Sequence, residues 1–293
     1  MDLRIVKLLV AWYSSQLFHV RWGNVLSDGF TVSNGVRQGG ILSPFLYNLY
    51  TNSLSAALDD TGVGCHYLGS VNHVAYADDM ILLAPTPFGL QTLTCYRFSV
   101  EHDIVYSTKK TVCMVRCPKV FKKMSLPQFM LCDTILGFVK SFKYLGFLMS
   151  DDMCDNLEIQ QQYRMLCCRT NSLIRKLSMC SYPVKRYVFT SYCATVYCVH
   201  IWRVYRASVV KKFKVCLNNA ARIFFGYDRF CSASAMYVCE HAANLDVVLR
   251  KAAWGFLRRI CSSRNNIIRS LVDSDLGKSS AFRALWNRAL LSQ

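Results

Sequence analysis

Two adjacent carboxylates, Asp78 and Asp79, are the residues of this sequence best suited to chemistry. They interrupt two apolar runs at residues 74–77 and 80–84, and this pattern predicts a β-hairpin with the acids at its tip. Mg²⁺ binds a few carboxylates and completes its shell with water and substrate phosphates. A solvated acidic turn between two strands would have the same sequence, so both interpretations stay open on these residues alone.

A glycine-rich loop precedes the acids by about 40 residues, and it leads into a predicted helix. The loop covers residues 33–44. Ser43 at its end is expected to be the helix N-cap and Pro44 the first helical residue. Apolar residues then recur at spacings of three and four as far as Leu58. The loop is therefore expected to be held at the start of a helix that packs on one face.

The loop carries groups suited to phosphates and bases. Gly39 and Gly40 let a ligand or another backbone approach closely. Arg37 offers a planar fork for phosphate, and Gln38 offers an amide that both donates and accepts. A helix-leading turn with no ligand is the alternative for this segment taken alone.

The charge of the chain favours a polyanionic partner. Its 35 Lys and Arg outnumber 18 Asp and Glu, which gives a net charge of +17 over 293 residues. Residues 1–150 hold 13 basic and 9 acidic residues, whereas residues 151–293 hold 22 and 9. This shift indicates a boundary near residue 151. The cluster of Lys211, Lys212 and Lys214 could follow nucleic-acid phosphates, although a solvated helix face would look the same.

Secondary-structure signals change at the same point. Short β-rich runs separated by turns come first, and long helical patterns follow. The strands are expected at residues 71–84, 111–117 and 142–149, and the helices at residues 157–177 and 184–204, with Pro183 in the first turn of the second helix.

Other functional classes find little support. The longest strongly apolar run, residues 192–202, is too short to cross a bilayer, and the N-terminus has no signal-peptide pattern, so an intracellular protein without a membrane partner is expected. The 15 cysteines are scattered and set in apolar runs; reduced core thiols rather than disulfides are expected. No Cys-x-x-Cys spacing suggests zinc, and the six histidines form no recognisable hydrolase triad.

Together the two segments resemble the palm of reverse transcriptases, specifically those of non-LTR, LINE-like retrotransposons. The Gly-Val-Arg-Gln-Gly loop at residues 35–39 and the Tyr-Ala-Asp-Asp box at residues 76–79 occur in the family's order. Residues 109–114 resemble the lysine motif that follows this box, and residues 142–146 resemble the hairpin that grips the primer end. The basic helical region after residue 150 resembles the thumb.

The resemblance implies a fold and a reaction. The fold is α+β: a partial polymerase palm over residues 1–150, with an antiparallel sheet and helices, followed by an all-helical thumb and connecting region over residues 151–293. The reaction is RNA-directed DNA synthesis, in which deoxynucleoside triphosphates are added to a DNA primer end on an RNA template. The implied cofactor is Mg²⁺, with two ions in the intact site.

The resemblance also assigns roles to single residues. Asp78 and Asp79 would bind the catalytic metal, and Lys110 would lie near the triphosphate as a charge or proton donor. Four loop residues would sit beside the templating pair and the incoming nucleotide: Arg37, Gln38, Gly39 and Gly40. The primer would be held by Lys143, Tyr144 and Gly146.

Two departures from the family pattern limit the expected activity. The family has a further catalytic Asp on an upstream strand, but Asp2 and Asp28 are the only acids before Gly35 and neither has that setting. The fingers and this first metal ligand are therefore expected to be absent from the chain. Ser107 also replaces the usual Asn three positions before Lys110, and residues 90–101 are a few residues short for the intervening helix.

We therefore expect a reverse transcriptase fragment that is inactive as an isolated chain, and whether it is an enzyme stays open. Close placement of two Mg²⁺ ions needs negative charge nearby, and the loss of one carboxylate in three weakens that charge. The alternatives are a non-catalytic nucleic-acid-binding remnant and a decayed transposon product. In the last case, a missing strand would leave an unpaired sheet edge.

Overall fold

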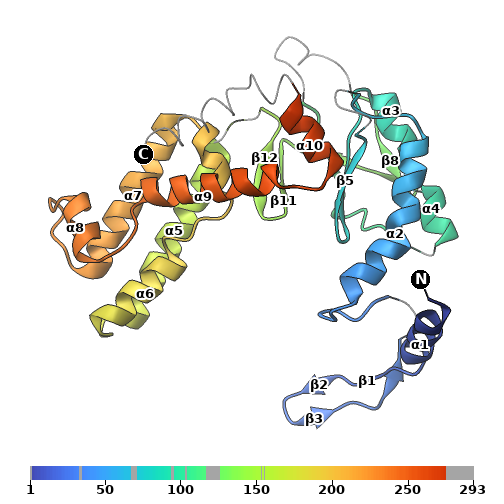
Figure 1. Cartoon of the computed structure of the whole chain (residues 1–293), viewed down its shortest axis with the longest axis horizontal. Coiled ribbons are helices and arrows are strands. Elements are labelled where there is room, and N and C mark those ends of the chain that lie inside the picture. The colour runs from blue at the N-terminus through green and yellow to red at the C-terminus, as the bar shows by residue number, and fades with distance from the viewer. Residues whose placement is uncertain are drawn as a thin grey trace. The chain divides into compact units, whose positions relative to one another are not determined.

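The computed structural model describes residues 2–32, 35–66, 71–93, 96–102, 104–116, 126–152, 154 and 156–274 (Figure 1). The chain forms two compact units. The first comprises Met1–Thr61 and His73–Ile81, and the second comprises Gly62–Asn72 and Leu82–Gln293. Ser33 and Asn34 of the predicted loop, Cys117 of the predicted strand and residues 275–293 of the predicted helical region lie outside the described residues.

In its described residues, the first unit combines two helices with three pairs of short strands. Strand β1 pairs with β4 and β2 pairs with β3, both antiparallel, and β5 pairs with β6. The elements are α1 (Leu3–Ser14), β1 (Leu17–Phe18), β2 (Arg21–Trp22), β3 (Val25–Leu26), β4 (Phe30–Thr31), α2 (Ser43–Asp60), β5 (His73–Tyr76) and β6 (Asp79–Leu82).

Short strands open the second unit, and helices follow. Strands β7 and β10 pair in parallel, whereas β8–β9 and β11–β12 are antiparallel pairs. The first elements are α3 (Pro87–Thr92), α4 (Tyr96–Glu101), β7 (Val112–Cys113), β8 (Met130–Leu131), β9 (Thr134–Ile135), β10 (Gly137–Phe138), β11 (Ser141–Tyr144) and β12 (Phe147–Ser150). The helices that follow are α5 (Asn156–Leu177), α6 (Tyr182–Tyr192), the 3₁₀ helix η2 (Val199–Val204), α7 (Ala207–Phe225), α8 (Ala233–Cys239), α9 (Leu245–Cys261) and α10 (Asn266–Asp273).

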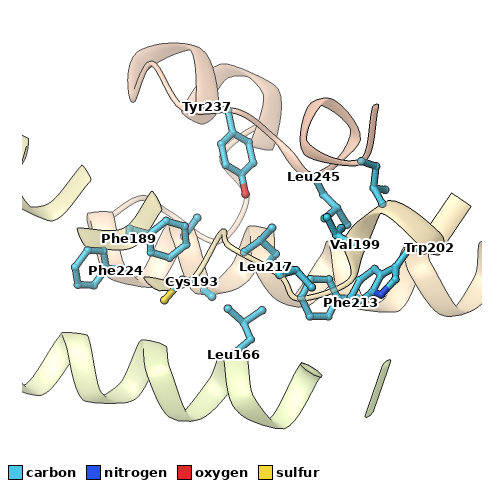
Figure 2. Packing of buried hydrophobic residues seen from close by; sticks show 14 of the residues in the cluster. Leu166, Phe189, Cys193, Val199, Trp202, Phe213, Leu217, Phe224, Tyr237 and Leu245 are labelled. Carbon is cyan, nitrogen blue, oxygen red and sulfur yellow. The ribbon is translucent and has the colours of Figure 1, made fainter. Parts of the chain in front are cut away.

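Helix α7 provides the centre of the hydrophobic core in the second unit. Its apolar face, which includes Phe213 and Leu217, is almost completely buried, and α5 packs along it. Figure 2 shows Leu166 of α5 pointing toward the side chains of α7. The indole of Trp202 meets the ring of Phe213 edge to face at 4.9 Å between centroids, and Phe189 of α6 stacks on Phe224. Each fully buried side chain of this size contributes about 1.5–3 kcal/mol.

The predicted helix over residues 157–177 is confirmed as α5, but the second prediction is only partly right. Helix α6 ends at Tyr192, and the chain turns before it re-forms as η2. At the turn, the Thr195 hydroxyl donates to the Thr190 carbonyl, and Cys198 takes a left-handed conformation with φ 53°. The turn lets Val196 and Trp202 both enter the core, which a continuous helix would prevent.

The expected class, α+β, is confirmed. The expected antiparallel sheet is found among the described strands only as separate pairs. They pair only in twos, and β7–β10 is parallel. The predicted hairpins at residues 71–84 and 142–149 do form, as β5–β6 and β11–β12. The division of the chain into palm and thumb near residue 151 stays a prediction.

Two further expectations concern membranes and thiols. None of the helices in the described ranges is long and apolar enough to cross a membrane. All the cysteines whose surroundings are described carry free thiols.

Substitution Leu217→Ala should lower the free energy of unfolding by about 2–5 kcal/mol, because it leaves a cavity in the core beside α5. Urea unfolding followed by circular dichroism measures this change. The matched control is Val215→Ala on the same helix, whose side chain is 50% exposed, and it should change the stability by less than about 1 kcal/mol. Equal losses in the two variants would contradict the placement of this core.

Candidate active site

Asp78 and Asp79 lie at the tip of the β5–β6 hairpin, as the sequence predicted. The two residues between the strands are Ala77 and Asp78, and Asp79 begins β6. Ala77 has φ 52°, a left-handed conformation that is rare for a residue with a Cβ and costs on the order of 1 kcal/mol. The tight turn exposes both carboxylates to solvent.

Helix α2 runs alongside this hairpin and has a contact near each end. At one end, His73 Nδ1 of β5 lies 3.9 Å from Asp59 Oδ1, which is near the C-terminus of α2. At the other end, burial raises the pKa of Tyr47 above its ordinary value, and the negative charge of Asp78 raises it further. Tyr47 lies in the first turns of α2, so the Asp78 turn is near the N-terminal part of this helix.

The glycine-rich loop is folded against the same end of α2. The Arg37 carbonyl accepts hydrogen bonds from the Gly40 N–H at 3.0 Å and from the Ser43 hydroxyl. Gly39 has φ 80°, and a Cβ on Gly40 would come within 2.6 Å of Ser43 Oγ. Both glycines are therefore required by the local geometry, one by its backbone conformation and the other by close approach.

The prediction of Ser43 as N-cap is wrong by one position. Leu42 occupies the cap without a side-chain bond, and Ser43 is the first residue of α2. The reason is that the Ser43 hydroxyl donates to the Arg37 carbonyl and does not accept from the helix N–H groups. This bond ties the loop to the helix more directly than a cap would.

Arg37 and Gln38 are exposed in this loop, where a ligand could reach them. The Arg37 guanidinium carbon lies 5.5 Å from the centre of the Phe18 ring, a cation–π contact. Phe18 belongs to β1 and packs near Phe30 of β4, with 6.3 Å between the ring centres. The β1–β4 pair therefore supports the side chain that the sequence suggested for phosphate.

The remaining predicted residues belong to the second unit. Lys110 lies exposed in a turn before β7, and the Ser107 carbonyl holds this turn by accepting from the N–H groups of Lys110 and Thr111, both at 3.0 Å. The other three residues are in the β11–β12 hairpin: Lys143, Tyr144 and Gly146.

The β11–β12 hairpin has a two-residue loop. Leu145 and Gly146 have φ 47° and 83°, the two positive values of a type I′ turn. Lys143 is exposed on β11 and faces Leu148 on β12, and Tyr144 faces Phe147. The structure thus brings these three predicted residues together on one hairpin, and it brings the Asp78 turn and the Arg37 loop to one end of α2.

Neither of the two acids in residues 2–32, Asp2 and Asp28, joins Asp78 and Asp79 as a third carboxylate. Asp2 caps α1, where its carboxylate accepts from the Arg4 N–H at 2.9 Å and pairs with the Arg4 guanidinium, and these hydrogen bonds lower its pKa. Asp28 lies in the link between β3 and β4. Within the described ranges, no group of three or more His, Cys, Asp or Glu side chains is arranged around a common metal position.

Similarity to known proteins agrees with this arrangement. The family described as reverse transcriptase (RNA-dependent DNA polymerase) matches residues 3–149, about half of the chain. The chain belongs to the reverse transcriptase family. It is also 40% identical over 68 residues to the retrovirus-related Pol polyprotein from type-2 retrotransposable element R2DM of Drosophila melanogaster. The resemblance to non-LTR retrotransposons is thereby confirmed.

The aligned stretch is short compared with this relative. It covers 23% of the chain and 6% of the Pol polyprotein. Reverse transcriptases act on a nucleic-acid template and primer with nucleotide substrates, and they use divalent metal ions.

Substitution Asp78→Asn should lower the pKa of Tyr47, because it removes the negative charge that opposes formation of the phenolate. The pKa can be followed by NMR in protein labelled with ¹³Cζ-tyrosine. The Asp59→Asn variant removes a carboxylate near the C-terminal end of α2, far along the helix from Tyr47, and should leave the Tyr47 pKa unchanged. An unchanged Tyr47 pKa in Asp78→Asn would show that the two side chains do not face each other.

Proposed function

We propose that this chain is a reverse transcriptase fragment whose Asp78 and Asp79 belong to a site for catalytic Mg²⁺. The reaction of the intact enzyme is RNA-templated addition of deoxynucleotides to a DNA primer end, and the chain by itself is inactive. One observation supports the proposal: the Arg37–Gly40 loop is bonded to the first residue of α2, and the charge of Asp78 acts on Tyr47 in the first turns of the same helix. The proposed metal ligands and the proposed phosphate ligand would thus lie near the same part of α2, within one unit.

The donor set at the hairpin tip suits a hard cation. Asp78 and Asp79 offer only carboxylate oxygens, both are exposed, and Mg²⁺ typically takes one or two carboxylates and leaves room for water and substrate phosphates. When bound, the metal would activate the primer 3′-hydroxyl and neutralise charge on the leaving pyrophosphate.

The chain's other residues would bind and orient the substrates. Arg37 would pair with phosphate through its fork while the Phe18 ring supports its guanidinium face. Gln38 and the two glycines would lie against the templating pair and the nucleotide, since a glycine backbone permits such close approach. Lys110 would supply a positive charge or a proton to the leaving pyrophosphate, and the hairpin with Lys143 would hold the primer end.

The helical region would add binding to the nucleic-acid backbone. An open groove of about 460 Å³ between α5 and α7 is lined by Lys211 and Lys212, together with Tyr163 and Asn219. Both lysines are exposed and can reach phosphates, whereas Lys214 on the same helix is paired with Asp246. At this groove, the two lysines would make a salt-sensitive, sequence-tolerant contact with the phosphates of a primer–template.

The chain should bind a primer–template with an affinity that falls steeply with salt, and Lys211→Ala with Lys212→Ala should reduce the slope of log Kd against log salt by about two. Fluorescence anisotropy with a labelled RNA–DNA duplex measures the slope. Removal of both Lys214 and Asp246 as alanines keeps the net charge and should leave the slope unchanged. A slope that does not respond to Lys211 and Lys212 would exclude this groove from binding.

The chain of 293 residues, tested by itself, should not extend an oligo(dT) primer on poly(A) with Mg²⁺ and dTTP, because two carboxylates hold less negative charge than a pair of divalent ions requires. Incorporation of labelled dTTP is the measurement. Extension that disappears in Asp78→Asn would contradict inactivity and make the chain an enzyme. Binding without extension is the expected outcome, and a chain that neither binds nor melts cooperatively would be a decayed product.

A further inference from the structure

Among the strands that the structure describes, the β11–β12 hairpin joins no wider sheet. Its two strands pair only with each other, and a two-stranded ribbon has marginal stability by itself in water. A hairpin that must present Lys143 to a primer end therefore needs its orientation supplied from elsewhere in the fold. Two side chains outside the hairpin, Glu158 and Tyr197, bond directly to its backbone.

Glu158 binds the outer edge of β12. Its carboxylate accepts from the Leu148 N–H at 3.0 Å, which is directed away from the partner strand, and from the Gln162 amide at 2.8 Å. The residue is only 1% exposed and lies in the first turn of α5, where the helix dipole favours a negative charge. A buried carboxylate is costly unless it is fully hydrogen-bonded, so its position is tightly defined.

Tyr197 binds the turn of the same hairpin. Its hydroxyl donates to the Leu145 carbonyl, and its ring lies so close to Gly146 that a Cβ there would come within 3.1 Å of it. Gly146 therefore has two reasons to be glycine: its φ of 83° and this ring. Tyr197 thus ties the turn that follows Lys143 and Tyr144 to the segment that leads into η2.

The two attachments converge on one place in the helical region. Burial raises the pKa of the Cys198 thiol, the Tyr197 hydrogen bond opposes this rise, and the negative charge of Glu158 adds to it. Cys198 is therefore near both side chains. At the C-terminal end of β12, the Ser150 hydroxyl donates to Asp152 at 2.7 Å, and this bond lies in the link to α5.

We propose that Glu158 and Tyr197 are positioning residues, which fix the β11–β12 hairpin on the helical region so that it presents Lys143 to the primer end. This inference rests on the proposed function, because it assumes that the hairpin holds the primer. Neither residue touches a substrate in this role. Each acts through the backbone of the hairpin, Glu158 at β12 and Tyr197 at the turn.

The test uses the full chain and an RNA–DNA primer–template whose primer carries 4-thiothymidine at its 3′ end. Illumination crosslinks the primer end to nearby residues, and mass spectrometry gives the yield on the peptide that contains residues 141–150. In Tyr197→Phe and in Glu158→Gln this yield should fall by about fivefold, the effect of losing one of the hydrogen bonds that attach the hairpin. The melting temperature of Tyr197→Phe should stay within a few degrees of the original chain.

Two control variants separate the loss of a hydrogen bond to the hairpin from a general effect of changed charge or of a lost hydroxyl. Glu158→Gln raises the net charge, which by itself would strengthen binding to nucleic acid, so a lower yield cannot come from bulk electrostatics. Glu101→Gln makes the same charge change on an exposed residue of α4, and Tyr187→Phe removes an exposed hydroxyl on α6. Both controls should keep the original yield.

The outcomes distinguish the inference from the proposed function. Lys143→Ala should also lower the yield. If it does while Tyr197→Phe keeps the original yield, the positioning role is wrong and the primer contact stands. If Lys143→Ala has no effect, the hairpin does not hold the primer and the inference fails with it. Should Glu158→Gln fail to fold, Tyr197→Phe still decides the question, since it deletes a single oxygen from a side chain that is 52% exposed.

Discussion

Packing against α7 is the interaction on which the helical part of the second unit depends. Phe213 and Leu217 are enclosed by α5, α6, η2 and α9, and this cluster is large enough to stabilise the helices around it. The same packing sets the start of α5 and the segment before η2. Those two places hold Glu158 and Tyr197, so the core also determines where the β11–β12 hairpin is attached.

The first unit is organised differently, around the contacts of one helix. Leu54 and Leu58 of α2 are buried, but many large apolar side chains of this unit are exposed, including Leu8 and Trp22. Polar contacts of α2 therefore help to place the loop and the hairpin: Ser43 bonds to Arg37, and Asp59 lies near His73. Such contacts are directional, and they define orientation more than they add stability.

Local patterns in the sequence predicted the parts of the structure that depend on neighbouring residues. The apolar runs on each side of Asp78 and Asp79 were enough for a hairpin, and the helical spacing of residues 157–177 was enough for α5. The break after Tyr192 could not be predicted in this way, because it depends on Val196 and Trp202 entering a core formed by residues far along the chain. The pairing of strands in twos could not be predicted from the sequence either, because it depends on which other strands of the fold lie beside each strand.

The residues of the candidate site likewise include some that the sequence predicted and some that only the structure revealed. Motif order pointed to Arg37, Asp78 and Lys143, whereas no sequence signal marked Tyr47, Glu158 or Tyr197. A tyrosine in an apolar run and a glutamate near a helix start are ordinary in sequence. Their roles depend on which backbone atom or charge lies opposite them, and only the fold determines that.

The left-handed alanine in the carboxylate turn has a consequence for precision. Glycine at position 77 would adopt φ 52° without strain, but it would also let the turn sample many other conformations. The Cβ of Ala77 removes most of those alternatives, both in the unfolded chain and around the native turn. Alanine at this position therefore costs a small amount of local stability. In return, the neighbouring Asp78 carboxylate can point in a narrower range of directions. In the proposed metal site, two carboxylates that approach one ion together would benefit directly from that restriction.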